Sequence, residues 1–526
     1  MKADASNEQR FITEVDAFEF ITRDIATLLH SLDDWIAGLT SDLNVHRLSW
    51  EGLRERGALA LQADTVNALL WKHRQAWSQE LIELEATQAL ADHFDEKALL
   101  LVFGKFNAGK SSFCNFLADR FAAHGRSVQY FHVDAGQIVD MTEPFKEGAT
   151  ETTSRLQGVR LGDKLVLLDT PGLHSVTPEN SALTQRFTDS ADGVLWLTSS
   201  TSPGQVQELD ELSRELHRNK PLLPVVTRSD IYDEDEVDGE IVKILCNKPA
   251  PRRALQEADI EARAKEKLVT MDVDTALLKP PVSISAYMAR EQGQTPAAMI
   301  EAGFERLYAA LLAIAEPALD YKRRKQAEIL LHHLEENVLG TLHSEVRPLL
   351  VELEQATQAA LSALEKKQQQ IANTVWRRIV PTLPGLLDQH AAAHDVAGLS
   401  QVVSQAIRTI FASELVGQFA DYVVAPDMSL AQIELDHNAV FEDIVIDRAG
   451  ENGNLSHVAG VDYGRVHAAL SQAIHQCLLA LSSDAARQSR ASIQQLIEHV
   501  ERLRAALQGH ERGLIDLKWK VRSESA

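Results

Sequence analysis

The chain has 526 residues, a formal net charge of −24, and 45% hydrophobic and 6% aromatic residues. This length exceeds one ordinary hydrophobic core and predicts two or three folding units. The acidic balance disfavours nucleic acid as a partner. Three widely separated cysteines give no disulfide framework or zinc spacing, so we expect reduced thiols. With neither a secretory signal nor a run of about 18 apolar residues, we expect a cytoplasmic protein whose membrane contact is at most peripheral.

The first 97 residues have the apolar periodicity of helices. From Phe11 to Leu39, apolar residues recur at every third or fourth position, which predicts one long amphipathic helix. A second helix is expected after the polar stretch "TSDLNVHRLSW", reaching about Ala91. We interpret residues 1–97 as an N-terminal helical arm.

The hydrophobic pattern of residues 98–316 differs from that of the N-terminal arm. Short uninterrupted apolar runs alternate with helical stretches, and the runs read "ALLLVF", "KLVLLD", "GVLWLT", "PLLPVV" and "PVSIS". Such runs are typical of strands buried on both faces, so they predict a mainly parallel sheet covered by helices in an α/β domain.

The first apolar run leads into a glycine-rich loop of the G-x-x-x-x-G-K-[ST] pattern, followed by a helical pattern. Backbone N–H groups of such a loop cradle phosphates, and the helix N-terminus adds its positive dipole end. Lys110 is expected to reach the β/γ-phosphate oxygens, and Ser111 is expected to bind Mg²⁺. The expected nucleotide-binding residues of the loop are Gly104, Lys105, Phe106, Asn107, Ala108, Gly109, Lys110, Ser111 and Ser112.

Two further segments could complete the phosphate site. The sequence "DTPG" follows the run "KLVLL", so that Asp169 can hold Mg²⁺ through water and the N–H of Gly172 can sense a γ-phosphate. Upstream, the polar segment "EGATETTSR" contains a threonine that could close over the γ-phosphate and join the Mg²⁺ shell. Thr153 is our first choice for this switch residue, and Thr152 is the second.

The segment "TRSD" after "PLLPVV" is interpreted as the reader of the base. The Asp230 carboxylate could accept hydrogen bonds from the N1–H and 2-amino groups of guanine, which adenine cannot supply. Thr227 and Arg228 belong to the same expected site. Ser285 and Ala286, after "PVSI", are placed where a backbone N–H could meet the guanine O6.

After Pro317 the helical periodicity returns, and we interpret residues 317–526 as a C-terminal helical bundle. Proline removes a backbone donor and biases the preceding residue away from helix, so we expect a helix break and a hinge at Pro317. The basic run 322–325 is interpreted as a solvated helix face, and the glycine-bearing segment 447–464 as an irregular loop. Both helical arms would expose apolar stripes alone, so we expect them to pack together as one antiparallel bundle.

The ordered set GKFNAGKSS, TETT, DTPGL, TRSD and ISA resembles the five motifs of the translation-factor-type GTPases. With helices on both sides, the G-x-F-N-A-G-K-S loop resembles that of the bacterial dynamin-like GTPases. The resemblance implies a Mg²⁺-dependent GTP hydrolase with a helical neck and trunk and a membrane-binding tip, which we place within 380–465. It also implies self-association of GTPase domains, or pairing with a related dynamin-like partner.

Two residues depart from the general GTPase pattern. Arg228 stands where lysine is usual, and its aliphatic stem can still cover the purine. Leu173 stands where Ras-like switches carry a water-orienting glutamine, which leaves the transition state short of one stabiliser. We expect K⁺ held by the Asn107 side chain to replace it, as in other "N-x-G-K-S" GTPases. The alternative is that Asn107 only stabilises its own turn. The expected catalytic residues are Lys110, Thr153 and Asn107, and the expected metal ligands are Ser111, Thr153 and Asp169.

We therefore expect a dynamin-like GTPase in which closure of two GTPase domains drives movement of the helical bundle, in membrane remodelling or vesicle-related work. The alternative function is a regulatory switch whose helical arms dock partner proteins without mechanical work. A P-loop kinase or ATPase is disfavoured by Asp230 and the Ser285–Ala286 pair.

Overall fold

The computed structural model describes residues 6–20, 25–91, 94, 96–105, 107–134, 137–147, 156–169, 188–201, 205–237, 240–450 and 453–523. The chain forms two compact units. The first combines residues 1–36, 78–337 and 513–526, and the second combines residues 37–77 and 338–512. Each unit therefore draws on both ends of the sequence.

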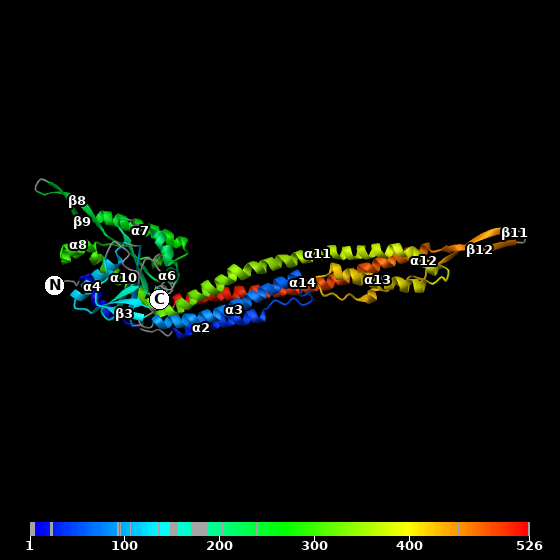
Figure 1. Cartoon of the computed structure of the whole chain (residues 1–526), viewed down its shortest axis with the longest axis horizontal. Coiled ribbons are helices and arrows are strands. Elements are labelled where there is room, and N and C mark those ends of the chain that lie inside the picture. Colours follow the sequence, from blue (N-terminus) through cyan, green and yellow to red (C-terminus); the bar gives the residue numbers. More distant parts are fainter. Residues whose placement is uncertain are drawn as a thin grey trace. The chain divides into compact units, whose positions relative to one another are not determined.

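An eight-stranded sheet forms the centre of the first unit (Figure 1). Its strand order is β10-β7-β6-β1-β5-β4-β2-β3. The first five strands in this order are parallel, whereas β4 and β3 each run antiparallel to their neighbours. The strands are β1 (Ala98–Phe103), β2 (Val128–Asp134), β3 (Gln137–Met141), β4 (Gln157–Leu161), β5 (Leu165–Asp169), β6 (Gly193–Ser199), β7 (Leu222–Thr227) and β10 (Val282–Ser283).

Helices cover both faces of this sheet, as the apolar runs predict. One core cluster packs the sheet against α1 (Asn7–Asp16), α4 (Lys110–Ala123) and α10 (Phe304–His333). The other cluster packs it against η3 (Val206–Leu212), α6 (Ser213–His217) and α7 (Ala250–Thr270). Two short helices, α8 (Ala286–Glu291) and α9 (Pro296–Glu301), precede α10. The α/β sheet with a predominantly parallel arrangement is confirmed.

The expectation of one long helix from Phe11 to Leu39 is wrong. Helix α1 ends at Asp16, and α2 (Ala26–Val45) begins separately. The reason is tertiary packing: Phe11 and Val15 are buried in the core of the α/β domain, where the Phe11 ring contacts those of Phe121 and Tyr308. The apolar residues of α1 therefore pack in the α/β domain, and the similar apolar spacing after residue 25 belongs to a separate helix, α2.

The expected helix break at Pro317 is also wrong, because α10 runs through this proline. The missing N–H costs one helical hydrogen bond. Ile314 and Ala318 on either side are buried, and α10 packs along β1, β6 and β7. This apolar packing offsets the lost hydrogen bond and keeps the helix continuous.

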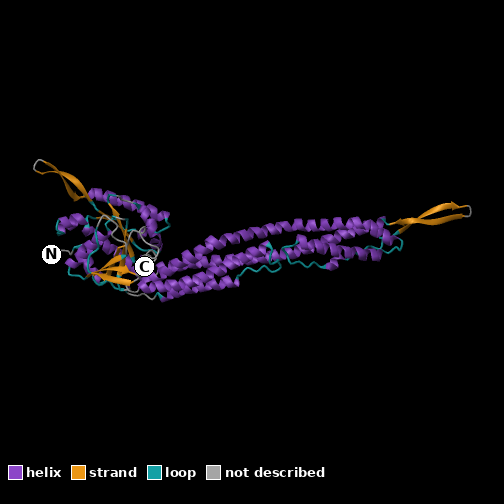
Figure 2. Ribbon diagram, in the orientation of Figure 1, coloured by secondary structure: helices purple, strands orange, loops and turns teal. Residues whose placement is uncertain are grey.

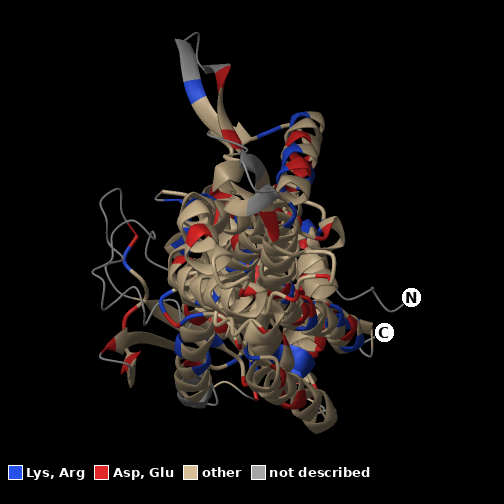
Figure 3. Ribbon diagram, turned by 90° about the vertical axis from the view of Figure 1, so that its right-hand side faces the viewer, with Lys and Arg blue, Asp and Glu red and all other residues tan. Residues whose placement is uncertain are grey.

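The second unit is a helical bundle built from both arms of the chain, as expected. Within it, His73 of α3 (Ala58–Ala91) lies 3.0 Å from Glu345, and His510 of α14 (Gly464–Ser523) lies 2.8 Å from Asp42. The other helices are α11 (Arg347–Ile379), α12 (Leu383–Ala391) and α13 (Val396–Gln418). Acidic and basic residues are interspersed along the helices (Figure 3). None of the helices in the described part of the chain is long and apolar enough to span a membrane.

The described residues also form two isolated β-hairpins (Figure 2). In the second unit, β11 (Glu442–Gly450) pairs with β12 (Gly453–Asp462), so the expectation of an irregular loop at 447–464 is wrong. The glycines flank the turn, while β-branched residues such as Ile444 and Val458 favour the strands. In the first unit, β8 (Asp230–Val237) pairs with β9 (Glu240–Asn247).

Candidate nucleotide-binding site

The loop between β1 and α4 has the backbone that a phosphate cradle needs. Gly104 has a φ of 151°, and a Cβ placed there would lie 2.2 Å from the carbonyl oxygen of Leu197. Gly109 has a φ of 85° and immediately precedes the first residue of α4, Lys110. These conformations and close contacts explain the two glycines of the motif, and they direct the N-terminus of α4 toward the loop.

Asn107 and Ala108 lie at the turn of this loop. Asn107 has a φ of 62°, a left-handed conformation that asparagine tolerates better than most residues, and its side chain is exposed. The Ala108 carbonyl oxygen accepts a hydrogen bond from the Thr227 hydroxyl at 2.7 Å. The "TRSD" segment therefore supports the phosphate loop directly, because its first residue fixes the position of the turn.

The Lys110 ammonium lies across the loop. Its Nζ donates to the carbonyl oxygens of Gly104 at 2.7 Å and Lys105 at 3.2 Å. Burial lowers the pKa of Lys110, and the nearby Asp169 carboxylate partly opposes this shift. The ammonium is thus held where phosphate oxygens would lie, and an anionic ligand would compensate its desolvation.

Asp169 and Ser111 meet at the ends of β5 and of the loop. The Ser111 hydroxyl donates to Asp169 Oδ2 at 2.6 Å, and Gln157 Nε2 donates to the same oxygen at 2.8 Å. Asp169 is fully buried, which raises its pKa. Its other oxygen, Oδ1, is buried and accepts no hydrogen bond from the described residues. A buried carboxylate oxygen without a partner, next to a hydroxyl, suits the hard oxygen coordination of Mg²⁺.

The residues expected to read the base also come together. The Ser285 hydroxyl donates to Asp230 Oδ2 at 2.6 Å, and the Ser229 N–H donates to the Ile284 carbonyl at 2.9 Å. Ser285 caps α8, whose first residue is Ala286. The "TRSD" and "ISA" segments, far apart in the sequence, therefore form one joined surface at the carboxyl ends of β7 and β10.

Arg228 of this surface is exposed and has a φ of 54°. Its carbonyl oxygen accepts a hydrogen bond from the Ser200 hydroxyl. The backbone is therefore fixed while the guanidinium faces solvent, which leaves the side chain free to cover a purine.

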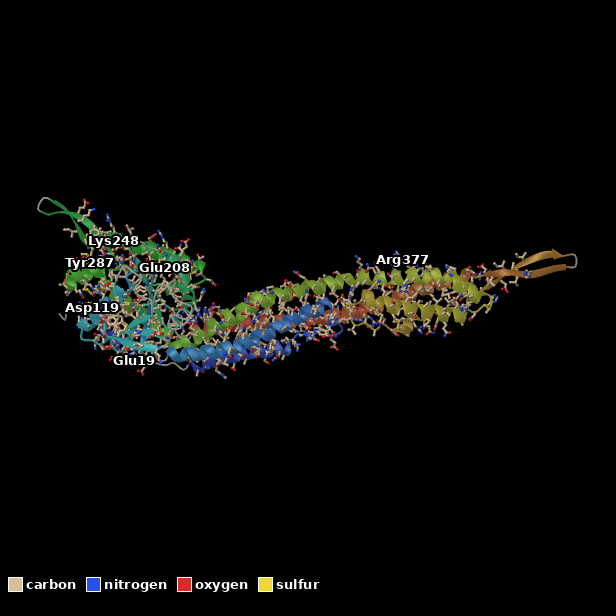
Figure 4. All side chains as sticks on the ribbon, in the orientation of Figure 1. Glu19, Asp119, Glu208, Lys248, Tyr287 and Arg377 are labelled. Atoms are coloured by element: carbon tan, nitrogen blue, oxygen red, sulfur yellow. The ribbon has the colours of Figure 1, made fainter. Side chains whose placement is uncertain are left out.

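Sequence reasoning missed Lys248 near the base-reading surface. The Lys248 N–H donates to the Ser229 carbonyl at 3.0 Å, and Asn247 pairs with Asp230 across the β8–β9 ladder. Burial lowers the pKa of Lys248, whereas Asp230 opposes that shift. Figure 4 labels Lys248 on the same domain as Tyr287. No sequence motif predicts this position for Lys248, because Lys248 lies near Asp230 only through the pairing of β8 with β9.

Sequence reasoning also missed the support behind Ser112. The Arg290 guanidinium lies 3.5 Å from the Ser112 hydroxyl and forms ion pairs with Glu147 and Asp119. Asn115 bonds both the N–H and the carbonyl of Phe145. These contacts fix the chain that enters the expected switch segment. In the sequence, the one sign of these contacts is that Asn115 interrupts the apolar stretch "FCNFL".

Several predicted residues lie outside the described residues: Phe106, Thr152, Thr153, Gly172 and Leu173. Their roles stay predictions. The structure brings together the remaining predicted nucleotide-binding residues of the loop, of "TRSD" and of "ISA", together with Asp169.

This geometry defines a P-loop GTPase domain. Residues 100–228 match the family model described as a 50S ribosome-binding GTPase. The protein ACIAD1444 of Acinetobacter baylyi, described as uncharacterized, is 44% identical over 517 residues, which is 98% of this chain and 99% of that protein. The chain belongs to the same family as this relative, and residues 100–228 give it a GTPase domain.

Solved structures of bacterial dynamins align over most of the chain, but with low sequence identity and low TM-scores. The LeoA bacterial dynamin GTPase from ETEC is 12% identical, with 99% of this chain and 100% of that chain covered and a TM-score of 0.29. A member of an oligomerised bacterial dynamin pair, described as sensing and tethering membranes, is also 12% identical, with 94% and 80% covered and a TM-score of 0.31. At these TM-scores the superpositions carry no conclusion about this chain.

Proposed function

We propose that this GTPase uses GTP-dependent association of two GTPase domains to move its helical bundle at a membrane surface. The observation that carries the proposal is that one chain combines a P-loop GTPase domain, in which Ser111 contacts Asp169 and Ser285 contacts Asp230, with a helical bundle built from both arms of the sequence. Residues 468 apart in the sequence, Asp42 and His510, meet in this bundle, so a movement of the bundle would involve both arms of the chain.

We assign the nucleotide contacts as follows. The loop N–H groups and Lys110 bind the phosphates, Asp230 binds the guanine N1–H and 2-amino groups, and Thr153 closes over the γ-phosphate. Ser111, Asp169 and Thr153 would hold Mg²⁺, and this ion would neutralise charge that develops on the phosphate oxygens. The free Asp169 Oδ1 supports this assignment.

Asn107 is assigned to a potassium ion. Its side chain is exposed at the turn of the loop, so its oxygen is available as a neutral ligand. A monovalent cation beside the β- and γ-phosphates would stabilise the negative charge that develops there in the transition state. Leu173 has no polar group that could do so. Closure by a second GTPase domain would complete the cation site, so turnover should depend on protein concentration.

The β11–β12 hairpin is our candidate for lipid contact, within the range 380–465 that the sequence suggests for the tip. Ile444, Val445, Ile446 and Val458 are each about half exposed, at 48%, 53%, 53% and 50%. Such a cluster of exposed apolar side chains indicates an interaction surface. The adjacent Glu442 and Asp443 would be repelled by anionic lipid, so we expect apolar insertion into neutral membranes rather than electrostatic adsorption.

Two measurements test this proposal together. Phosphate release from GTP should rise with protein concentration, and protein with a GTP analogue should sediment with neutral phosphatidylcholine vesicles. Replacing Ile444 and Ile446 by Ser should abolish sedimentation and leave GTP turnover without vesicles unchanged. Protein that stays monomeric with the analogue and ignores vesicles would instead favour the switch function, in which the arms only dock partner proteins.

A further inference from the structure

The basic run 322–325 on α10 is not a solvated helix face. The side chains of Lys322 and Lys325 are only 10% and 11% exposed. Lys325 Nζ lies 2.6 Å from Asp192 Oδ1 and also donates to the Ser190 carbonyl at 2.6 Å. Lys322 Nζ donates to the Phe94 carbonyl at 3.0 Å and lies 3.8 Å from the other oxygen of Asp192. Burying two ammonium groups is costly unless they are paired, so these contacts are specific.

Asp192 connects these lysines to the strand that carries the phosphate loop. It is fully buried, its Oδ2 accepts a hydrogen bond from the Leu99 N–H at 2.8 Å, and its own N–H donates to the Leu99 carbonyl at 2.7 Å. Leu99 lies on β1, which leads directly to Gly104. A displacement of β1 would therefore shift Asp192 and, through the ion pair with Lys325, would act on α10.

The residues just before Asp192 are held by a second set of cations. Lys220 Nζ donates to the carbonyl oxygens of Thr188 at 2.9 Å and Asp189 at 3.1 Å. The Arg218 guanidinium lies 2.8 Å from Asp189 Oδ1, and its side chain is only 1% exposed. Residues 188–192 end the stretch of chain that begins at Asp169, so this clamp lies at the exit of the expected nucleotide-sensing segment.

Helix α10 is also tied to the end of the chain. Glu328, fully buried, accepts hydrogen bonds from Arg324 at 3.2 Å and from Arg522 of α14 at 3.1 Å. Arg522 also donates to the His217 carbonyl at 2.8 Å. One face of α10 therefore contacts the exit segment, and the next turn contacts α14.

We propose that Lys322 and Lys325 are positioning residues that couple the nucleotide state of the GTPase domain to α10 by holding Asp192 and Ser190. This inference rests on the proposed function, because it names the contact through which GTP would act on the helices. Neither lysine touches the nucleotide. Each acts through the exit segment and β1.

Hydrogen–deuterium exchange of α10 in the GDP state and with a GTP analogue tests this proposal. In the wild type, exchange over residues 304–333 should differ between the two states. Lys325→Met and Lys322→Met should lose that difference while GTP affinity stays unchanged, and Lys325→Arg should retain it. The matched control is Arg323→Met, because Arg323 pairs only locally with Asp320 among the described residues and should behave as the wild type.

The outcomes are distinguishable. If the methionine variants keep the wild-type difference, the lysines are structural and the proposal is overturned. If the wild type binds GTP but shows no difference over α10, the coupling and the proposed movement both fail. If the wild type does not bind GTP, the proposed function itself fails. If Lys325→Met has a lowered unfolding midpoint, Lys325→Gln is compared with Lys325→Arg below both midpoints. The glutamine variant lacks the ion pair with Asp192 and should lose the difference, and a glutamine variant that keeps it would overturn the proposal.

Discussion

The Ser285 hydroxyl donates to Asp230 Oδ2 at 2.6 Å across a sequence separation of 55 residues. This bond orients one oxygen of the carboxylate and leaves the other for a ligand. It also joins the first residue of β8 to the N-cap of α8, so the residues expected to read the base meet only in the folded domain.

Asp230→Asn should change base preference. The amide can donate to the 2-oxo group of xanthine, whereas it cannot accept both guanine donors. Loss of charged hydrogen bonds should weaken GTP binding by about 10- to 100-fold and strengthen binding of xanthosine triphosphate. Competition titrations with both nucleotides measure this, with Asp233→Asn on the same strand as control. Undiminished guanine preference in the Asp230 variant would mean that another group reads the base.

Lys110→Ala should remove tight nucleotide binding. Its ammonium is the charge that the carbonyl oxygens of Gly104 and Lys105 hold over the loop. We expect at least about a 10-fold loss of GTP affinity, because a charge-assisted contact to phosphate is lost. Equilibrium binding of a fluorescent GTP analogue measures the change, and Lys265→Ala on the exposed face of α7 is the control. Equal affinities of the two variants would contradict the assignment.

Thr227→Val should destabilise the phosphate loop. The substitution leaves the Ala108 carbonyl oxygen without its hydroxyl donor in a buried position. We expect the free energy of unfolding to fall by about 1–3 kcal/mol. Urea unfolding measures this, and Thr270→Val, whose hydroxyl bonds its own helix at the surface, is the matched control. A Thr227 variant as stable as the control would show that the bond is dispensable.

Asp169→Asn should separate stability from magnesium binding. Burial raises the pKa of Asp169, so the folded chain holds its proton more tightly than the unfolded chain does. Ionisation therefore reduces stability as the pH rises through the folded pKa, and the reduction persists at neutral pH. The variant without ligand should unfold at a higher temperature than the wild type at neutral pH.

The same Asp169→Asn variant should lose the increase in unfolding temperature that GTP with Mg²⁺ gives the wild type. Thermal unfolding with and without Mg²⁺ measures this, and Asp163→Asn in the turn between β4 and β5 is the control. An unchanged response to Mg²⁺ would exclude Asp169 from the metal site.

Asn107→Ala should remove the effect of potassium. We expect wild-type turnover to be faster in K⁺ than in Na⁺ or Cs⁺, and the variant to be equally slow in all three salts. Phosphate release at dilute and concentrated protein measures this dependence. Equal wild-type rates in all salts would leave Asn107 as a turn-forming residue, consistent with its φ of 62°.

The sequence predicts the local chemistry of this protein better than its long-range contacts. The phosphate loop, Asp169 and the "TRSD" segment follow from residue type and spacing, since each lies at the end of a buried strand. Lys248 and Lys325 could not be predicted in this way, because the β8–β9 hairpin and the packing of α10 bring them to their partners. The errors at Phe11–Leu39 and at Pro317 have the same cause: burial in the core of the α/β domain overrides helical periodicity and proline propensity.

The central claim is that this chain hydrolyses GTP through association of two GTPase domains. Phosphate release should therefore be measured from GTP and from ATP, with Mg²⁺ and K⁺, over a series of protein concentrations. We predict turnover of GTP alone, with a rate per molecule that rises with concentration. No release from GTP at any concentration, or equal turnover of ATP, would contradict the account.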